Sequence, residues 1–190
     1  PTRRSSDLRE INNEAASLAG VDAVLKGRII RMSTDEGDIE KTEKKGYMKK
    51  EVSKENEQGE TVKDYEYFKT EYTEYRKKNS ATLEITYQLI STVNGEIIVA
   101  DQFRISEIDE VHYAEYKGDD DHLVPGHWTD RNRNHRSDVV RDNKNDVREL
   151  QALLDAEKEP RTVSGLKSAL YDQAVSRIVE KVDQYNPENL

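Results

Sequence analysis

Aspartate and histidine, two residue types that serve as metal ligands, occur together in the stretch GDDDHLVPGHW at 118–128. The candidate ligands are Asp119, Asp121, His122 and His127, because carboxylate and imidazole groups bind divalent cations. No predicted helix or strand fixes the geometry of these side chains, however, and the stretch has the composition of a solvated acidic loop. We therefore predict no metal site and no cofactor for this chain.

A second stretch, DRNRNHRSDVVR, has part of the spacing of a calcium-binding loop. Asp130, Asn132 and Asn134 occupy its first, third and fifth positions. The match then fails, because the sixth position holds His135 in place of glycine and the twelfth holds Arg141 in place of a bidentate glutamate. The stretch therefore predicts no calcium binding.

Catalytic motifs are not evident in this sequence. It contains no G-x-S-x-G elbow, no Walker loop and no H-E-x-x-H motif. Carboxylates are so abundant in this acidic chain that a pair of them identifies no acid–base couple. We expect no enzyme, and only a pocket that brings His112, His122 or His127 to a carboxylate would revive that alternative.

Aromatic residues are concentrated in TVKDYEYFKTEYTEYRK, which we predict to be a strand because tyrosine is favoured in strands. Alternation places positions 65, 67 and 75 on one face and positions 68 and 72 on the other. Rings so placed could stack on a sugar or an exposed peptide, although ordinary sheet pairing explains them as well. The candidate interaction surface is Tyr65, Tyr67, Phe68, Tyr72, Tyr75 and Trp128.

The clearest secondary-structure signal is ATLEITYQLISTVNGEIIVADQFRI, whose apolar residues alternate with polar ones around an Asn-Gly turn. A three-residue loop with Gly95 in the left-handed conformation would place Leu89 opposite Val99 and Ile85 opposite Phe103. Because this register keeps apolar partners together, we predict it over the alternative two-residue loop.

Amphipathic helices are predicted near both ends of the chain, at 9–20, 146–160 and 163–185. The last is the strongest, because six apolar residues recur along one face at helical spacing. They are Val163, Leu166, Leu170, Ala174, Ile178 and Val182.

The order of these elements predicts an α+β fold, an antiparallel sheet with amphipathic helices packed on one face. A strand at 21–32, VDAVLKGRIIRM, belongs to the same sheet. We predict one domain over 9–190. Two segments interrupt it, a polar insert at about 33–78 and an irregular loop at about 106–142.

Composition limits the function further. Hydrophobic residues make up 34% of the chain, charged residues 36%, and the net charge is -9. An acidic balance disfavours nucleic acid, which proteins usually contact with clustered lysine and arginine. The chain contains no cysteine, so no disulfide or thiolate metal site is possible within it. No run approaches the roughly 18 apolar residues of a membrane helix.

The first eight residues, PTRRSSDL, are the translation of CCT ACA CGA CGC TCT TCC GAT CT, with any base completing the last codon. That DNA resembles the end of a common sequencing adapter. We therefore interpret residues 1–8 as a non-native, adapter-derived segment fused to a metagenomic gene fragment, whose true N-terminus is missing.

Three segments resemble the CsgG-like family of bacterial envelope lipoproteins, which includes the curli-secretion component. They are AASLAGVDAVLKGRI, LEITYQLISTVNGEIIVADQF and SALYDQAVSRIVEKV, and together they cover roughly half of the chain. The residues at the family's matching places are Ala23, Val24, Gly27, Gly95, Glu96, Ala174 and Val175.

The resemblance implies a non-enzymatic domain of a periplasmic or outer-membrane lipoprotein that helps to secrete or assemble surface polymers. Its partners would be other envelope proteins or further copies of the chain, with no nucleic acid. Membrane attachment would come only through a lipid anchor in the missing N-terminus. Two other classes stay open: a small-ligand or glycan-binding module that uses the tyrosine-rich sheet or the His/Asp loop, and, least favoured, an uncharacterised enzyme.

Overall fold

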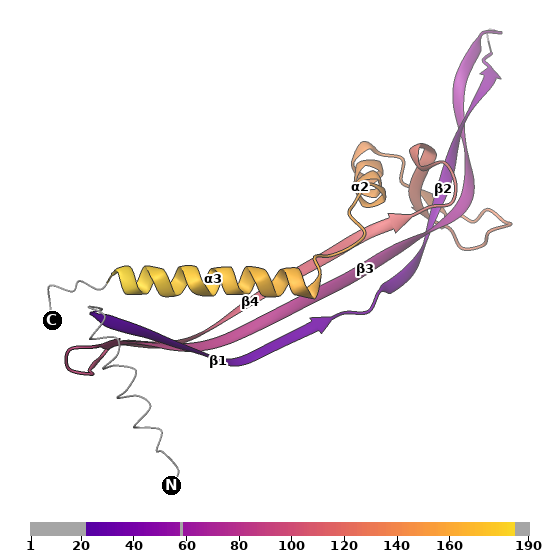
Figure 1. Cartoon of the computed structure of the whole chain (residues 1–190). Coiled ribbons are helices and arrows are strands. Elements are labelled where there is room, and N and C mark those ends of the chain that lie inside the picture. Colours follow the sequence, from indigo (N-terminus) through magenta and orange to yellow (C-terminus); the bar gives the residue numbers. More distant parts are fainter. Residues whose placement is uncertain (1–21, 58, 185–190) are drawn as a thin grey trace. The chain divides into compact units, whose positions relative to one another are not determined.

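The computed structural model describes residues 22–57 and 59–184 (Figure 1). The segment at 1–8, interpreted above as adapter-derived, and the predicted helix at 9–20 lie outside the described residues. The strand pairs β1–β3, β2–β3, β2–β5 and β5–β6 are antiparallel, and two long helices, α2 and α3, accompany the sheet. The α+β fold predicted from the sequence is therefore confirmed.

The described residues divide into two compact units. The first contains 22–36, 79–108 and 161–184, and the second contains 37–78 and 109–160. Two strands, β3 (Thr61–Ser91) and β4 (Ile97–Glu115), each contribute one half to the first unit and the other half to the second.

The first unit has a sheet in which β1 (Ala23–Glu36) pairs with the second half of β3, and β4 also pairs with β3. Leu25 lies opposite Leu89 and Ile29 opposite Ile85, and the register then shifts at Ile30. Such a bulge inserts one extra residue into an edge strand. β1 is the terminal strand of the described sheet order.

Helix α3 (Val163–Asp183) begins where the Thr162 side chain accepts a hydrogen bond from the Gly165 N–H. Its buried residues pack on the sheet side chains Leu83, Tyr87 and Phe103 and form one core cluster. The predicted stripe is therefore the buried face of this helix, at Leu166, Leu170, Ala174 and Ile178.

The turn between β3 and β4 is one residue longer than predicted. Ser91 N donates to Glu96 O, whereas the predicted three-residue loop places Thr92 opposite Glu96. The Ser91 hydroxyl accepts from Val93 N and the Asn94 side chain accepts from Glu96 N, and these bonds stabilise the longer loop. Gly95 is left-handed as predicted, with φ of 72°.

The second unit contains β2 (Glu40–Glu55), which pairs with the first half of β3 and with β5 (Leu123–His127). β5 in turn pairs with the short β6 (Val139–Val140). A 3-10 turn, η1 (Asp120–His122), precedes β5, and helix α2 (Lys144–Leu154) follows β6. A second core cluster forms where four buried residues meet, Tyr72, Ala114, Leu123 and Leu150.

One sequence prediction in this unit is confirmed and two were wrong. The strand predicted at 61–77 is part of β3, which is continuous over 31 residues. The rest of the predicted polar insert at about 33–78 is also mostly strand, because β2 covers Glu40–Glu55. The segment at about 106–142, predicted to be irregular, begins as part of β4, which continues to Glu115. β3 and β4 carry charged residues on both faces in this unit. The alternation of apolar and polar residues that reveals a half-buried strand is therefore absent from much of their length.

Candidate functional site

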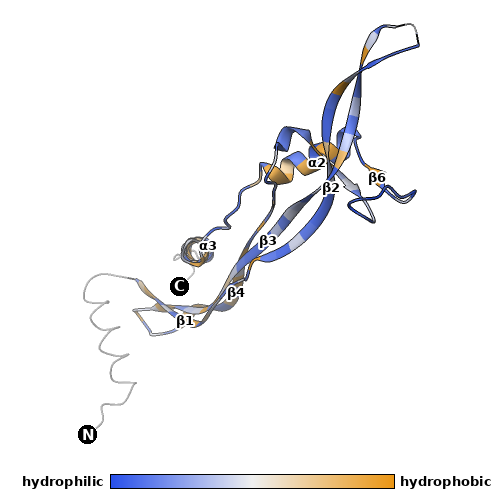
Figure 2. Cartoon of the chain, turned by 90° about the vertical axis from the view of Figure 1, so that its right-hand side faces the viewer, coloured by the Kyte–Doolittle hydropathy of each residue, from blue (hydrophilic) through white to orange (hydrophobic). Residues whose placement is uncertain are grey.

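The pairing of β2 with β3 continues without interruption from Glu40 opposite Arg76 to Glu55 opposite Thr61. β5 pairs with β2 only at Gly46–Met48. Within the described residues, the backbone of 49–55 and 61–67 therefore pairs only with itself, and we call residues 49–67 the arm. Figure 2 shows hydrophilic residues along most of the arm.

Two of the predicted surface aromatics lie on the arm and one lies at its base. Tyr65 is 43% exposed, and the Lys49 ammonium lies 4.0 Å from its ring centroid, a cation–π contact. Tyr67 donates its hydroxyl hydrogen bond to Asp142, which also pairs with Lys49 at 2.7 Å. The hydrogen bond to that carboxylate raises the pKa of Tyr67 to about 12. Phe68, at the base, is exposed.

Of the other three predicted aromatics, Tyr72 and Trp128 are buried and Tyr75 is half-buried. Tyr72 is buried in the second core cluster, and Tyr75 stacks on Tyr113 with ring centroids 4.8 Å apart. Trp128 is 3% exposed, and its indole N–H donates to the carbonyls of Gly46 and Thr70. The sequence signal that identified these rings, high aromatic density, does not distinguish a core from a surface.

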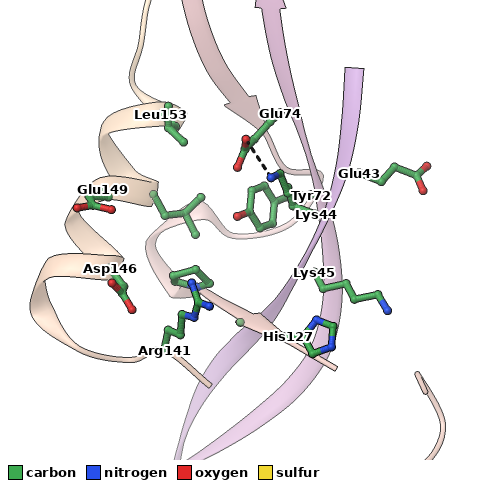
Figure 3. A pocket seen from close by; sticks show the side chains of 13 residues that line it. Glu43, Lys44, Lys45, Tyr72, Glu74, His127, Arg141, Asp146, Glu149 and Leu153 are labelled. Carbon is green, nitrogen blue, oxygen red and sulfur yellow. Dashed lines mark ion pairs between the residues drawn. The ribbon is translucent and has the colours of Figure 1, made fainter. Parts of the chain in front are cut away.

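A pocket of about 560 Å³ lies in the second unit between β2, β5 and α2 (Figure 3). Its apolar lining includes Tyr72 and Leu150, and its charged lining comes from several elements. The cationic side chains are Lys44, Lys45 and Arg141, and the carboxylates are Glu43, Glu74, Asp146 and Glu149.

Two ion-pair contacts at the lining of this pocket involve the Glu74 carboxylate, which lies close to two cationic or titratable side chains. The same carboxylate oxygen lies 3.2 Å from His112 Nε2 and 3.6 Å from Lys44 Nζ. Burial, followed by the charge of Glu74, raises the pKa of Tyr72 to about 12, so its phenol stays protonated at neutral pH. This arrangement can hold a ligand that carries both charge signs.

One histidine does meet a carboxylate of the pocket lining, because His112 Nε2 lies 3.2 Å from Glu74 Oε2, but the other histidines do not join it. His112 contacts Glu74 on β3, while His127 lies at the other end of the pocket from Asp146 and Glu149 (Figure 3). His122 pairs with Asp119 at 2.8 Å, both on exposed side chains. Within the described residues, no nucleophile is hydrogen-bonded to a histidine that a carboxylate orients, which is the arrangement nucleophilic catalysis requires.

The two sequence stretches considered for metal binding have other roles. Asp119 caps η1, because its carboxylate accepts from Asp121 N and contacts His122 Nδ1. In the calcium-like stretch, the carbonyls of Asp130 and Arg133 accept hydrogen bonds from the Lys69 ammonium. Within residues 22–57 and 59–184, no group of three or more His, Asp or Glu side chains is placed to hold a metal ion.

Comparisons with protein-family models, with curated proteins and with solved structures found no match to this chain. In the part of the chain that the structure describes, no helix has both the length and the apolar character needed to cross a membrane.

Proposed function

We propose that this chain is a non-enzymatic, protein-binding domain of a bacterial envelope assembly or secretion component. The proposal combines the CsgG-like resemblance of three sequence segments with one structural observation. That observation is an apolar surface of the first unit, formed by one flank of α3 and the terminal strand β1.

The two flanks of α3 differ in what covers them. On one flank Gln173 donates a hydrogen bond to Glu107 of β4, and the Arg177 guanidinium lies 4.5 Å from the Phe103 ring centroid. The opposite flank, on the side of β1, carries three exposed apolar side chains at helical spacing. They are Tyr171, Val175 and Val179.

The edge strand β1 continues this apolar surface. Leu25 and Ile29 are exposed, and their register with Leu89 and Ile85 places them on the sheet face that α3 covers. Within the described residues β1 pairs only with β3, so its other edge offers unpaired N–H and C=O groups. An extended segment that adds to β1 as a further strand would pair with these backbone groups and cover the exposed apolar side chains.

Charge defines the chemistry of that segment. Lys26, Arg28 and Arg31 lie on the other face of β1, where Lys26 is opposite Gln88 and Arg28 opposite Thr86. A strand added beside β1 would therefore alternate apolar residues, which pack toward α3, with acidic residues, which face these cations. The occupant we propose is such a segment of another envelope protein.

Site-specific photocrosslinking in bacteria that express the full-length protein tests this proposal. A photoreactive residue in place of Val175 should give an adduct that mass spectrometry maps to an apolar–acidic segment of an envelope protein. The same residue in place of Ser176, exposed on the far side of α3, is the matched control. Equal adducts at both positions would overturn the docking surface, and cytosolic residence of the full-length protein would overturn the envelope assignment.

One observation favours a second candidate, a small-ligand module. The pocket of about 560 Å³ brings together Tyr72 from the tyrosine-rich strand and His127 from the His/Asp region. A zwitterionic ligand would suit its mixed charges. Binding of amino acids or charged oligosaccharides, measured by calorimetry and lost in the Arg141→Ala variant, would support this candidate over the first.

A further inference from the structure

A closed loop of the second unit, residues 129–138, is held in one conformation at its neck. The hydroxyls of Thr129 and Ser137 lie 2.9 Å apart. The Asp138 carboxylate accepts from Thr129 N at 3.0 Å and from His135 N at 3.0 Å. These bonds join the two ends of the segment, which we call the arginine loop.

Lys69 of β3 fills the inside of the arginine loop. Its ammonium donates to the carbonyls of Asp130 at 2.8 Å and Arg133 at 2.6 Å, and to the Asp138 carboxylate at 2.6 Å. An ammonium has three N–H donors, so all of them are used. The loop is thus fixed through its backbone, through Asp138 and through the hydroxyls of Thr129 and Ser137, and these bonds use none of the side chains from Arg131 to Arg136.

The outward side chains are basic and amide groups. Every residue from 131 to 137 is exposed. Arg131 makes an exposed contact of 3.5 Å with Glu71, whereas the side chains of Arg133, His135 and Arg136 have no ion-pair or hydrogen-bond partner within the described residues. Three arginines within six residues are a local reversal of charge in a chain whose net charge is -9.

Acidic residues around the arginine loop favour a short anionic ligand over a long one. Guanidinium groups bind carboxylates and phosphates with paired N–H bonds, so either group could be recognised. A long polyanion would also meet the acidic neighbours, of which Glu71 is the nearest in contact. Two asparagines, Asn132 and Asn134, alternate with the arginines and offer both donors and acceptors to a peptide backbone.

We propose that the arginine loop is a preorganised binding site for a short acidic peptide segment, with Arg133 and Arg136 as the carboxylate ligands. The site is separate from the apolar surface of the first unit and does not rest on the proposed function. Because Lys69 fixes the loop backbone before binding, less conformational freedom is lost when the peptide binds.

Fluorescence titration of the full chain with a labelled peptide of alternating Glu and Asp tests the site. The Arg133→Ala/Arg136→Ala variant should bind at least about tenfold more weakly, and the affinity should fall as salt rises. The matched control is Lys144→Ala/Arg148→Ala, which removes two exposed cations from α2 and should change the affinity less than about twofold. Equal losses in the two variants would overturn the proposal.

A second variant separates a preorganised site from general charge attraction. Lys69→Met removes a side chain that is only 8% exposed and leaves the outward arginines in place. It should still weaken peptide binding severalfold, with the fold checked by circular dichroism. Should it not fold, Thr129→Val/Ser137→Ala loosens the neck instead and carries the same expectation. Unchanged affinity in the folded variant, or tighter binding of single-stranded DNA or inorganic phosphate than of the peptide, would refute the site.

Discussion

Lys69 Nζ lies 2.6 Å from Asp138 Oδ2, and the two side chains are only 8% and 11% exposed. The hydrogen bond from Lys69, followed by that from the His135 N–H, holds the pKa of Asp138 well below its usual value. This pair therefore links the ionisation of one carboxylate to the conformation of the arginine loop.

The first prediction concerns pH and the Asp138→Asn variant. Because the folded-state pKa of Asp138 is below its unfolded value of about 3.9, its ionised form stabilises the fold above about pH 4. That contribution is lost as the pH falls through the folded-state pKa. Urea unfolding should show that the variant has a lower free energy of unfolding than the parent at pH 7. This difference in free energy should become smaller as the pH falls toward 2. A difference of the same size at both pH values would contradict this coupling.

The second prediction tests the core of the first unit through Leu170→Ala. Leu170 has no exposed surface and packs in the cluster with Leu83 and Tyr87. Removing its side chain should lower the free energy of unfolding by about 2–5 kcal/mol. Val175→Ala, at a position that is 61% exposed, is the control and should change it by less than about 0.5 kcal/mol. Similar losses at both positions would mean that the buried face of α3 is misassigned.

The successful prediction of α3 and the incomplete prediction of β2 have one physical cause. Helix α3 buries a single stripe, so its apolar residues recur at helical spacing and the sequence alone reveals them. β2 exposes most of its residues on both faces and is held by backbone pairing with β3, which leaves little trace in side-chain type.

The candidate sites were predictable only in part, for a related reason. Tyr65 and Phe68 are exposed, as expected of an interaction surface. Tyr72 is instead a core residue that packs with Leu123 and Leu150, and Trp128 is buried with its indole N–H bonded to the carbonyls of Gly46 and Thr70. The arginine loop was visible only as a failed calcium motif. Its closure depends on Lys69, which lies 69 positions away from Asp138 and leaves no local signal.

The third prediction concerns Trp128→Phe. The indole N–H donates to Gly46 O at 3.2 Å and to Thr70 O at 3.3 Å, so it joins β2 and β3 to the start of the arginine loop. Phenylalanine keeps the aromatic packing but leaves both carbonyls without this donor. Unfolding followed by circular dichroism should show a loss of about 1–3 kcal/mol. Tyr65→Phe, on the exposed arm, is the control, and a loss there as large as that at Trp128 would contradict the buried role of the indole.

The last prediction concerns close packing where β5 meets β6. A Cβ atom added at Gly126 would lie 2.5 Å from both Val139 O and the Tyr47 ring. Neither neighbour can easily move, because Val139 O is backbone and Tyr47 is buried with its hydroxyl bonded to His127 O. Gly126→Ala should therefore cost about 1–3 kcal/mol, as overpacking does.

A glycine with open space around it gives the opposite expectation and serves as the control. At Gly27 on β1, the nearest atom to an added Cβ would be Thr86 O at 4.0 Å. Alanine fits there without strain and restricts the unfolded chain, so Gly27→Ala should leave stability unchanged or raise it by up to about 1 kcal/mol. The melting temperature should thus fall in Gly126→Ala and stay the same or rise in Gly27→Ala. A loss at Gly27 equal to that at Gly126 would show that a general strand effect, rather than contact with Tyr47 and Val139, sets the cost.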